Sequence, residues 1–297
     1  MKISTDNGTI RNVFGDVEAV RLIAEAGFDG IDYTFYGIDP NNDILALPDD
    51  ERYALAMEVK KTAEECGVDF PTSHAALSLR YDEGKDSKNY QDILRSMEFA
   101  SWIGCKQMVV HTLRFPLNEK DRDAKELALN KQFVGDLLEY AEKLDLNLVM
   151  ENLFRRDNKR QCYFGHHGTP EELNAFIDEM NHPRLRACCD LGHCALTGCE
   201  PEDFIRGMDA ERLTVLHVQD TDYKSDTHTI PYLGKHNWDA VTDALAEIGF
   251  KGTMNLEVLH FYEEFPADLL PAALKMAAAS ARKLADMVEQ KMENKQA

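Results

Sequence analysis

The sequence lacks any long apolar run. No stretch approaches the roughly 18 consecutive apolar residues that a membrane-spanning helix needs. The start, MKISTDNGTIRN, also lacks the apolar core of a signal peptide. We therefore expect no membrane segment and no export signal. The seven cysteines are an odd number, unlike a disulfide framework, so we expect reduced thiols in a cytoplasmic protein.

The chain is also poor in positive charge. It has 33 Lys and Arg against 53 Asp and Glu, which gives a formal net charge of −20 at pH 7. Proteins that bind a phosphate backbone neutralise it with Lys and Arg, so this balance argues against a nucleic acid partner. One short segment departs from the balance, because residues 155–160 contain Arg155, Arg156, Lys159 and Arg160. A solvated loop is the plain interpretation of such a run.

Nothing divides the 297 residues into parts. The sequence has no Pro-, Gly- or Ser-rich linker and no low-complexity segment. We expect one domain over residues 1–297, with about eight residues frayed at the polar carboxyl end. What recurs is one pattern, in which apolar residues at helical spacing give way to a Gly or polar turn and then to a short, largely apolar run. It stands at residues 22–33, 62–74, 99–111, 140–152 and 244–258.

This pattern predicts helices that alternate with strands buried on both faces. The predicted strands lie at about residues 2–5, 29–34, 68–73, 106–111, 146–151, 185–190, 213–218 and 253–258. Eight β–α units in a chain of this length predict an α/β fold, a single (β/α)8 TIM barrel. The alternative is an open doubly wound sheet, which would need a glycine-rich phosphate loop near the first strand. TDNGTIRN is a poor one.

Polar residues end most of the predicted strands. In a barrel, the carboxyl ends of the strands converge on one mouth, where catalysis takes place. A carboxylate or imidazole stands at or near six of these ends, namely His74, His111, Glu151, Asp190, His217 and Glu257. The adjoining loops add His193, Asp226 and His228. One such histidine alone is more often a hydrogen-bonded structural residue, but six groups at one end are hard to attribute to chance.

The three carboxylates in this set indicate a bound metal ion. The carboxylates of Glu151, Asp190 and Glu257 would repel one another in one mouth unless a cation lay between them. A divalent ion resolves this conflict, with His217 as the fourth ligand. One imidazole and three carboxylates form a hard, oxygen-rich set that favours Mn²⁺, Mg²⁺ or Co²⁺, with Zn²⁺ also open. We expect one divalent ion, with Mn²⁺ as the first choice.

Four of the seven cysteines lie in RLRACCDLGHCALTGC, residues 184–199, which suggests a zinc or redox site. Cys188 and Cys189 fall on a predicted strand, so their side chains should point to opposite faces of the sheet and pack as small apolar groups. The remaining cysteines do not supply the paired spacing of a zinc knuckle. We therefore assign the chemistry of this segment to Asp190 and His193.

The motifs resemble those of the xylose-isomerase-like TIM-barrel superfamily of sugar isomerases and epimerases, in order and over essentially the whole chain. The matching segments are LVMEN (148–152), CCDLGH (188–193), VLHVQDTD (215–222), SDTHTIPYLGKHNWDAV (225–241) and MNLEV (254–258). The resemblance implies that Glu151, Asp190, His217 and Glu257 hold the metal and that His193 contacts the substrate. It also implies that Glu151 and Glu257 form the acid/base pair.

The expected function is that of a divalent-metal-dependent isomerase or epimerase acting on a sugar, a sugar phosphate or a polyol. Removal of a proton next to a carbonyl leaves an enediolate, whose two oxygens can chelate the metal. Glu151 and Glu257 would remove and return the proton from opposite faces of the sugar. Further substrate contacts are expected from His74, His111, Asp226, His228, Arg155 and Arg156.

Three alternatives stay open. An inosose-type dehydratase would eliminate water after the same proton abstraction. The three-zinc apurinic endonucleases of this superfamily bind their metal ions through a set of residues that matches the nine His, Asp and Glu residues named above. The negative net charge argues against DNA as a substrate of this chain. A sugar-binding protein without activity is the alternative from a different class. Similar ketohexose epimerases usually have an Arg a few residues beyond the equivalent of His217, where this chain has Tyr223 and Lys224, so the sequence does not assign the sugar. A homo-oligomer is possible, and the sequence does not assign the oligomeric state either.

Overall fold

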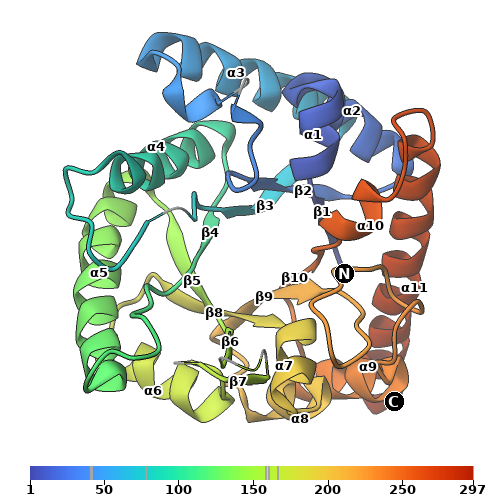
Figure 1. The fold of residues 1–297 in the computed structure, drawn as a ribbon. Coiled ribbons are helices and arrows are strands. Elements are labelled where there is room, and N and C mark those ends of the chain that lie inside the picture. Colours follow the sequence, from blue (N-terminus) through green and yellow to red (C-terminus); the bar gives the residue numbers. More distant parts are fainter. Residues whose placement is uncertain (41–42, 78, 158, 160, 166, 297) are drawn as a thin grey trace.

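The predicted strands form one closed parallel barrel in the described part of the chain (Figure 1). The structure is a computed structural model that describes residues 1–40, 43–77, 79–157, 159, 161–165 and 167–296. The strands are β1 Ile3–Asp6, β2 Gly30–Thr34, β3 Asp69–His74, β4 Gln107–Val110, β5 Asn147–Glu151, β8 Leu185–Asp190, β9 Leu213–Val218 and β10 Thr253–Leu256. Their order around the barrel is β1-β10-β9-β8-β5-β4-β3-β2. The TIM barrel prediction is confirmed, and each predicted strand boundary lies within two residues of the observed one.

Helices surround this barrel (Figure 1). They are α1 Gly8–Phe14, α2 Asp16–Ala26, α3 Asp49–Cys66, α4 Lys88–Ile103, α5 Arg122–Leu144, α6 Pro170–Met180, α7 Leu191–Thr197, α8 Pro201–Gly207, α9 Trp238–Ile248, α10 Leu259–Glu263 and α11 Leu270–Gln296, with a 3-10 turn η2 at Ile44–Ala46. None of these described helices combines the length and apolarity that a bilayer span requires. Helix α11 reaches Gln296, so fraying of its end in solution stays a prediction.

Local sequence sets the ends of these helices, as α4 illustrates. The Ser87 hydroxyl accepts the N–H of Tyr90 and caps the first turn. Gly104 ends the helix in the left-handed region, with φ at 90°, which a residue without a Cβ adopts at little cost. Between these ends, Ile93 and Met97 face the core on one side of the helix.

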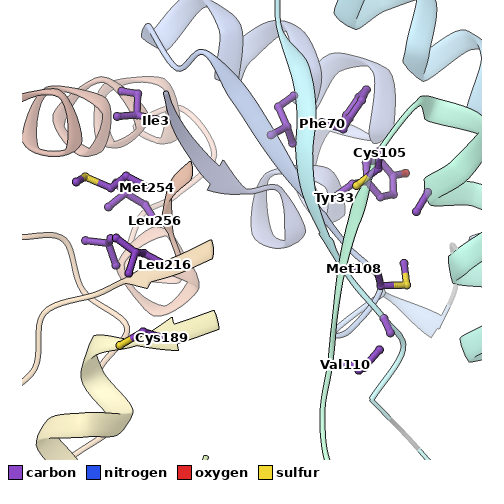
Figure 2. Packing of buried hydrophobic residues seen from close by; sticks show 14 of the residues in the cluster. Ile3, Tyr33, Phe70, Cys105, Met108, Val110, Cys189, Leu216, Met254 and Leu256 are labelled. Carbon is purple, nitrogen blue, oxygen red and sulfur yellow. The ribbon is translucent and has the colours of Figure 1, made fainter. Parts of the chain in front are cut away.

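The alternation of side chains along the strands separates two layers. Val109, Val149, Cys188 and Val215 form a small buried cluster of their own, one from each of β4, β5, β8 and β9. We interpret it as the plug of the barrel interior. Cys189 instead belongs to the large cluster between the strands and the helices, where Figure 2 shows it near Leu216. The two adjacent cysteines therefore pack on opposite faces, as predicted.

An antiparallel hairpin follows β5. It consists of β6 Phe154–Arg156 and β7 Cys162–Phe164, with Arg155 opposite Tyr163. The sequence predicts only a loop here, because strands of three residues in a cation-rich segment leave no apolar run to detect. The hairpin continues from the carboxyl end of β5, so it adds structure to the rim of the barrel mouth.

Candidate metal and substrate site

Strand alternation carries the predicted site residues into the barrel mouth. His111, Glu151, Asp190 and His217 each stand two positions beyond a member of the interior plug. Side chains two apart on a strand point to the same face, so these four point to the barrel axis. Glu257 follows the end of β10 and is buried as well. The plug thus forms the floor of the site.

Three carboxylates surround one imidazole nitrogen in this mouth. Nδ1 of His217 lies 2.9 Å from Oε1 of Glu151, 3.3 Å from Oε2 of Glu257 and 4.0 Å from Oδ2 of Asp190. Each of the four residues offers one ligand atom, and these atoms lie within 4.8 Å of one another. The structure therefore brings together the four residues that the sequence predicted as metal ligands.

The electrostatics of this group fit a cation. Burial, followed by the charges of Glu151 and Glu257, raises the pKa of Asp190 to about 7, against the opposing effect of His193. Burial alone would also raise the pKa of Glu151, but His217 and a second histidine hold it well below its usual range. Oε2 of Glu257 is buried and accepts no hydrogen bond from the described residues. An oxygen-rich donor set with an unused buried oxygen can hold a hard divalent ion.

Two more histidines flank the carboxylates from β3 and from the residue after β4. Nε2 of His111 lies 2.7 Å from Oε2 of Glu151. Nδ1 of His74 lies 2.8 Å from Oδ2 of Asp32, which leaves Nε2 3.7 Å from Oε1 of Glu257. His74, His111 and Glu151 form a second group with metal-ligand spacing. Asp32 was not predicted, although it is a buried carboxylate on a barrel strand, and it forms another such group with His74 and His217.

His193 is held by its backbone and its ring. Its N–H donates to Oδ1 of Asp190 at 2.7 Å, because Asp190 caps helix α7. Nδ1 of His193 lies 2.9 Å from the carbonyl oxygen of Asn152, while the Asn152 side chain pairs with the backbone of Asp190 in both directions. Asn152 therefore fixes both residues, a role that was not predicted from the sequence.

Gln219 connects Asp190 to the loop after β9. Its Nε2 donates to Oδ2 of Asp190 at 3.0 Å and to Oδ1 of Asp226 at 3.4 Å, and its Oε1 accepts the N–H of His228. A Cβ at Gly192 would come within 2.5 Å of this side chain, so glycine is required for the close approach. Gln219 was not predicted, although it follows the end of β9 and stands two positions after the site residue His217.

The loop residues form a fourth group. His193, Asp226 and His228 have ligand atoms within 4.8 Å of one another. Nε2 of His228 lies 3.3 Å from Oδ1 of Asp226, and Nε2 of His193 lies 3.7 Å from Oδ2. All the predicted His, Asp and Glu residues therefore gather around one mouth.

Tyr36 also belongs to the site and was not predicted. Its hydroxyl donates to Oε1 of Glu257 at 2.9 Å. Burial and the charge of Glu257 raise the pKa of Tyr36 well above its usual range, so the hydroxyl stays protonated as the donor. It comes from the loop after β2, where no sequence signal distinguishes it from the neighbouring aromatic residues.

The basic segment makes different contacts. Arg155 is buried and forms an ion pair with Glu126 of α5. The exposed Arg156 lies over the ring of Phe154, 5.3 Å from its centre. Arg160, the last cation of the segment, lies outside the described residues. Substrate contacts from Arg155 and Arg156 stay predictions.

Comparison with known proteins gives a family and a set of structural neighbours. The sequence profile of the xylose isomerase-like TIM barrel family matches residues 20–290. The fructoselysine 3-epimerase of Escherichia coli O157:H7 is 28% identical over 134 residues, which make up 45% of this chain and 46% of that protein. The chain thus spans about half the length of this relative.

Two solved structures superpose on most of the chain. A D-tagatose 3-epimerase-like protein has a TM-score of 0.72 at 18% identity, over 100% of both chains. The 3-keto-D-glucoside 4-epimerase of E. coli has a TM-score of 0.68 at 19% identity, over 94% of this chain and 99% of its own. At such identities the likeness shows the fold alone. The profile match over most of the sequence shows more, because by that match the chain belongs to the xylose isomerase-like TIM barrel family.

Proposed function

We propose that this protein is a divalent-metal-dependent isomerase or epimerase of a sugar or sugar derivative. The observation that carries the proposal is the approach of Glu151 and Glu257 to one nitrogen of His217, at 2.9 and 3.3 Å, from β5 and from the residue after β10. The epimerase names of the relative and of the two structural neighbours support the substrate class. The buried donor set, with Asp190 as its fourth member, supports the metal.

The chemistry that suits this arrangement is removal and return of a proton at a carbon next to a carbonyl. One glutamate removes the proton as a carboxylate, and the other, as a carboxylic acid, returns a proton. Return to the opposite face of the same carbon inverts the centre. Return to the former carbonyl carbon, with the hydroxyl proton passing between the two oxygens, moves the carbonyl. A divalent cation held by the four residues, with Mn²⁺ as the first choice, would stabilise negative charge on the substrate oxygens. Burial excludes water and strengthens the interaction of both glutamates with developing charge.

The other histidines and Asp226 are proposed as substrate contacts. His193 is fixed through Nδ1 by a backbone carbonyl, and its Nε2, which lies 3.7 Å from Oδ2 of Asp226, would contact a hydroxyl or carbonyl of the substrate. His74 and His111 lie beside the glutamates on one side, and Asp226 and His228 lie on the side of the β9 loop. We propose that they orient the sugar hydroxyls around the reacting carbon.

A second candidate function is favoured by the three further groups with metal-ligand spacing, two of which contain His74 and one of which contains His228. Several adjacent groups that share residues would suit a multi-metal phosphodiesterase. The net charge of −20 opposes this alternative, because a DNA enzyme needs basic surface. Nicking of abasic-site DNA and three bound ions per chain would favour it over the isomerase. One ion and no nicking are expected.

The proposal is tested by a screen of aldoses, ketoses, sugar acids and inososes in D₂O with added Mn²⁺. Incorporation of deuterium into a substrate C–H bond, with an isomer or epimer as product, is expected. Exchange that leads to loss of water would indicate the dehydratase, and sugar binding without exchange would indicate a binding protein. We further propose a cytoplasmic location, because all seven cysteines are free thiols.

A further inference from the structure

The barrel interior is apolar on one half and polar on the other. The apolar plug comes from β4, β5, β8 and β9. On β10, β1 and β2, which adjoin in the barrel (Figure 1), the side chains of Asn255, Ser4 and Asp32 hydrogen-bond in series. The Ser4 hydroxyl donates to Oδ1 of Asn255 at 2.9 Å, and Nδ2 of Asn255 donates to Oδ2 of Asp32 at 3.0 Å. Oδ2 of Asp32 also lies 2.8 Å from Nδ1 of His74, so this polar row reaches the mouth.

Asp6 extends the polar half at the end of β1. It lies on the same face of the strand as Ser4, because side chains two positions apart point to the same side. Asp6 is paired in register with Asp32 of β2. Its Oδ2 accepts the N–H of Val258, the residue after Glu257, at 3.2 Å. These contacts place the Asp6 carboxyl at the mouth, beside Asp32 and the segment that carries Glu257.

One oxygen of the Asp6 carboxyl has no partner. Oδ1 is buried and accepts no hydrogen bond from any residue that the structure describes, and the same holds for Oδ1 of Asp32. Buried carboxyl oxygens normally have a donor, so an unpaired one indicates a donor from outside the chain. Asp6 is 1% exposed, but Glu151 at 1% and His217 at 0% are equally buried. Burial to this depth therefore does not separate Asp6 from the site.

The charge of this side of the mouth limits the group that can supply the donor. Burial raises the pKa of Asp6 to about 7, and the charge of Glu257 adds to this effect. A phosphate or carboxylate would be repelled by the neighbouring carboxylates. A hydroxyl group is neutral, and it both donates and accepts hydrogen bonds. It can therefore pair with Asp6 whether the carboxyl is ionised or protonated.

We propose that Asp6 is a substrate contact whose Oδ1 binds a hydroxyl of the sugar, and that the end of the substrate on the β1 side of the mouth is an uncharged polyol chain. This inference rests on the proposed function. It adds a contact from β1 to those proposed from β3, β4 and the loop after β9. It also implies that a phosphate on the substrate would have to point away from β1.

The test compares Asp6→Asn and Asp6→Ala with the wild type, all loaded with metal. The control is Asp69→Asn, an exposed carboxylate at the start of β3 and hence at the opposite end of the barrel. The probes are D-fructose, D-glucose, D-xylose and D-fructose 6-phosphate. Affinities are measured by titration calorimetry, and kcat and KM by deuterium uptake. Asp6→Ala should weaken binding of a neutral sugar and raise its KM at least tenfold with kcat little changed, while the control should match the wild type.

Two further measurements separate a ligand contact from a structural residue. Monodeoxy analogues of the sugar that binds best identify the hydroxyl, because one analogue should lose affinity for the wild type and lose nothing further in Asp6→Ala. Urea unfolding without sugar reports the structural role. An asparagine at position 6 can still accept the N–H of Val258 and relieves carboxylate repulsion, so the urea midpoint of Asp6→Asn should not fall.

The outcomes distinguish this inference from the proposed function. Sugar binding that depends on Asp6, without deuterium uptake, would refute the isomerase and keep the contact. Deuterium uptake with an unchanged KM in both Asp6 variants would keep the isomerase and overturn the contact, as would a lower urea midpoint for Asp6→Asn. Binding of D-fructose 6-phosphate alone, weakened in Asp6→Ala, would overturn the uncharged polyol chain. Absence of binding by all four probes would overturn the contact as well.

Discussion

Replacement of Asp190 by Asn removes one negative charge from the mouth and preserves the shape of the side chain. Asp190 accepts the N–H of His193 at the start of α7, and an asparagine oxygen can accept the same bond. The variant should therefore fold like the wild type. It should lose affinity for a divalent ion, because one of the three carboxylates of the donor set is gone.

The magnitude follows from linkage. An ion that binds only the folded state stabilises it by about 2.7 kcal/mol when present at 100 times its dissociation constant. A change of 1 kcal/mol shifts the melting temperature of a domain of this size by about 2 °C, so the wild type should gain about 5 °C. In chelator, Asp190→Asn loses both carboxylate repulsion and an acceptor for Gln219. These effects oppose each other, so the two proteins should differ by at most ~1 kcal/mol.

The assay is differential scanning calorimetry of metal-stripped protein before and after addition of Mn²⁺, Mg²⁺, Co²⁺ or Zn²⁺. The wild type should gain stability with at least one ion, and Asp190→Asn should gain little or none. Cys188→Ser, two residues earlier and in the plug beneath the site, is the matched control and should keep the gain. An undiminished gain in Asp190→Asn, or no gain in the wild type with all four ions, would refute the ligand assignment.

Three other substitutions have defined outcomes. Tyr36→Phe removes a hydrogen bond to the Glu257 carboxylate that is worth about 1.5–3 kcal/mol. The kcat for deuterium exchange should therefore fall at least tenfold, while the metal-dependent rise in melting temperature persists. An unchanged kcat would exclude a positioning role for Tyr36. Asp220→Asn disturbs a buried carboxylate that accepts hydrogen bonds from four N–H donors. It should lower the free energy of unfolding, measured in urea, by about 2–4 kcal/mol. A decrease below about 1 kcal/mol would contradict this reasoning. Gly192→Ala places a methyl against Gln219 and should destabilise by about 1–3 kcal/mol, and a neutral result would show that the Gln219 side chain can move aside.

The barrel and the four proposed ligands could be predicted from the sequence because both depend on local patterns. A strand that is buried on both faces appears in the sequence as an apolar run. The polar residue at its carboxyl end lies at the mouth of the barrel. The alternation that places Val149 in the plug also places Glu151 in the site, and the same holds for Cys188 and Asp190. No knowledge of distant contacts was needed for these assignments.

The remaining parts of the site depend on contacts between distant segments. Tyr36 reaches Glu257 across 221 positions of the chain, and nothing near Tyr36 indicates that partner. Arg155 stands where a substrate contact was expected, but its partner Glu126 is a buried residue on a helix that reads as polar surface.

The central claim is that Glu151 and Glu257 exchange a substrate proton with solvent. The most direct measurement is deuterium uptake into the substrate C–H bond in D₂O, by the Mn²⁺-loaded wild type and by Glu151→Gln and Glu257→Gln. Uptake is predicted for the wild type, with a loss of at least about a hundredfold in each variant. Uptake at the wild-type rate in both variants would contradict the claim.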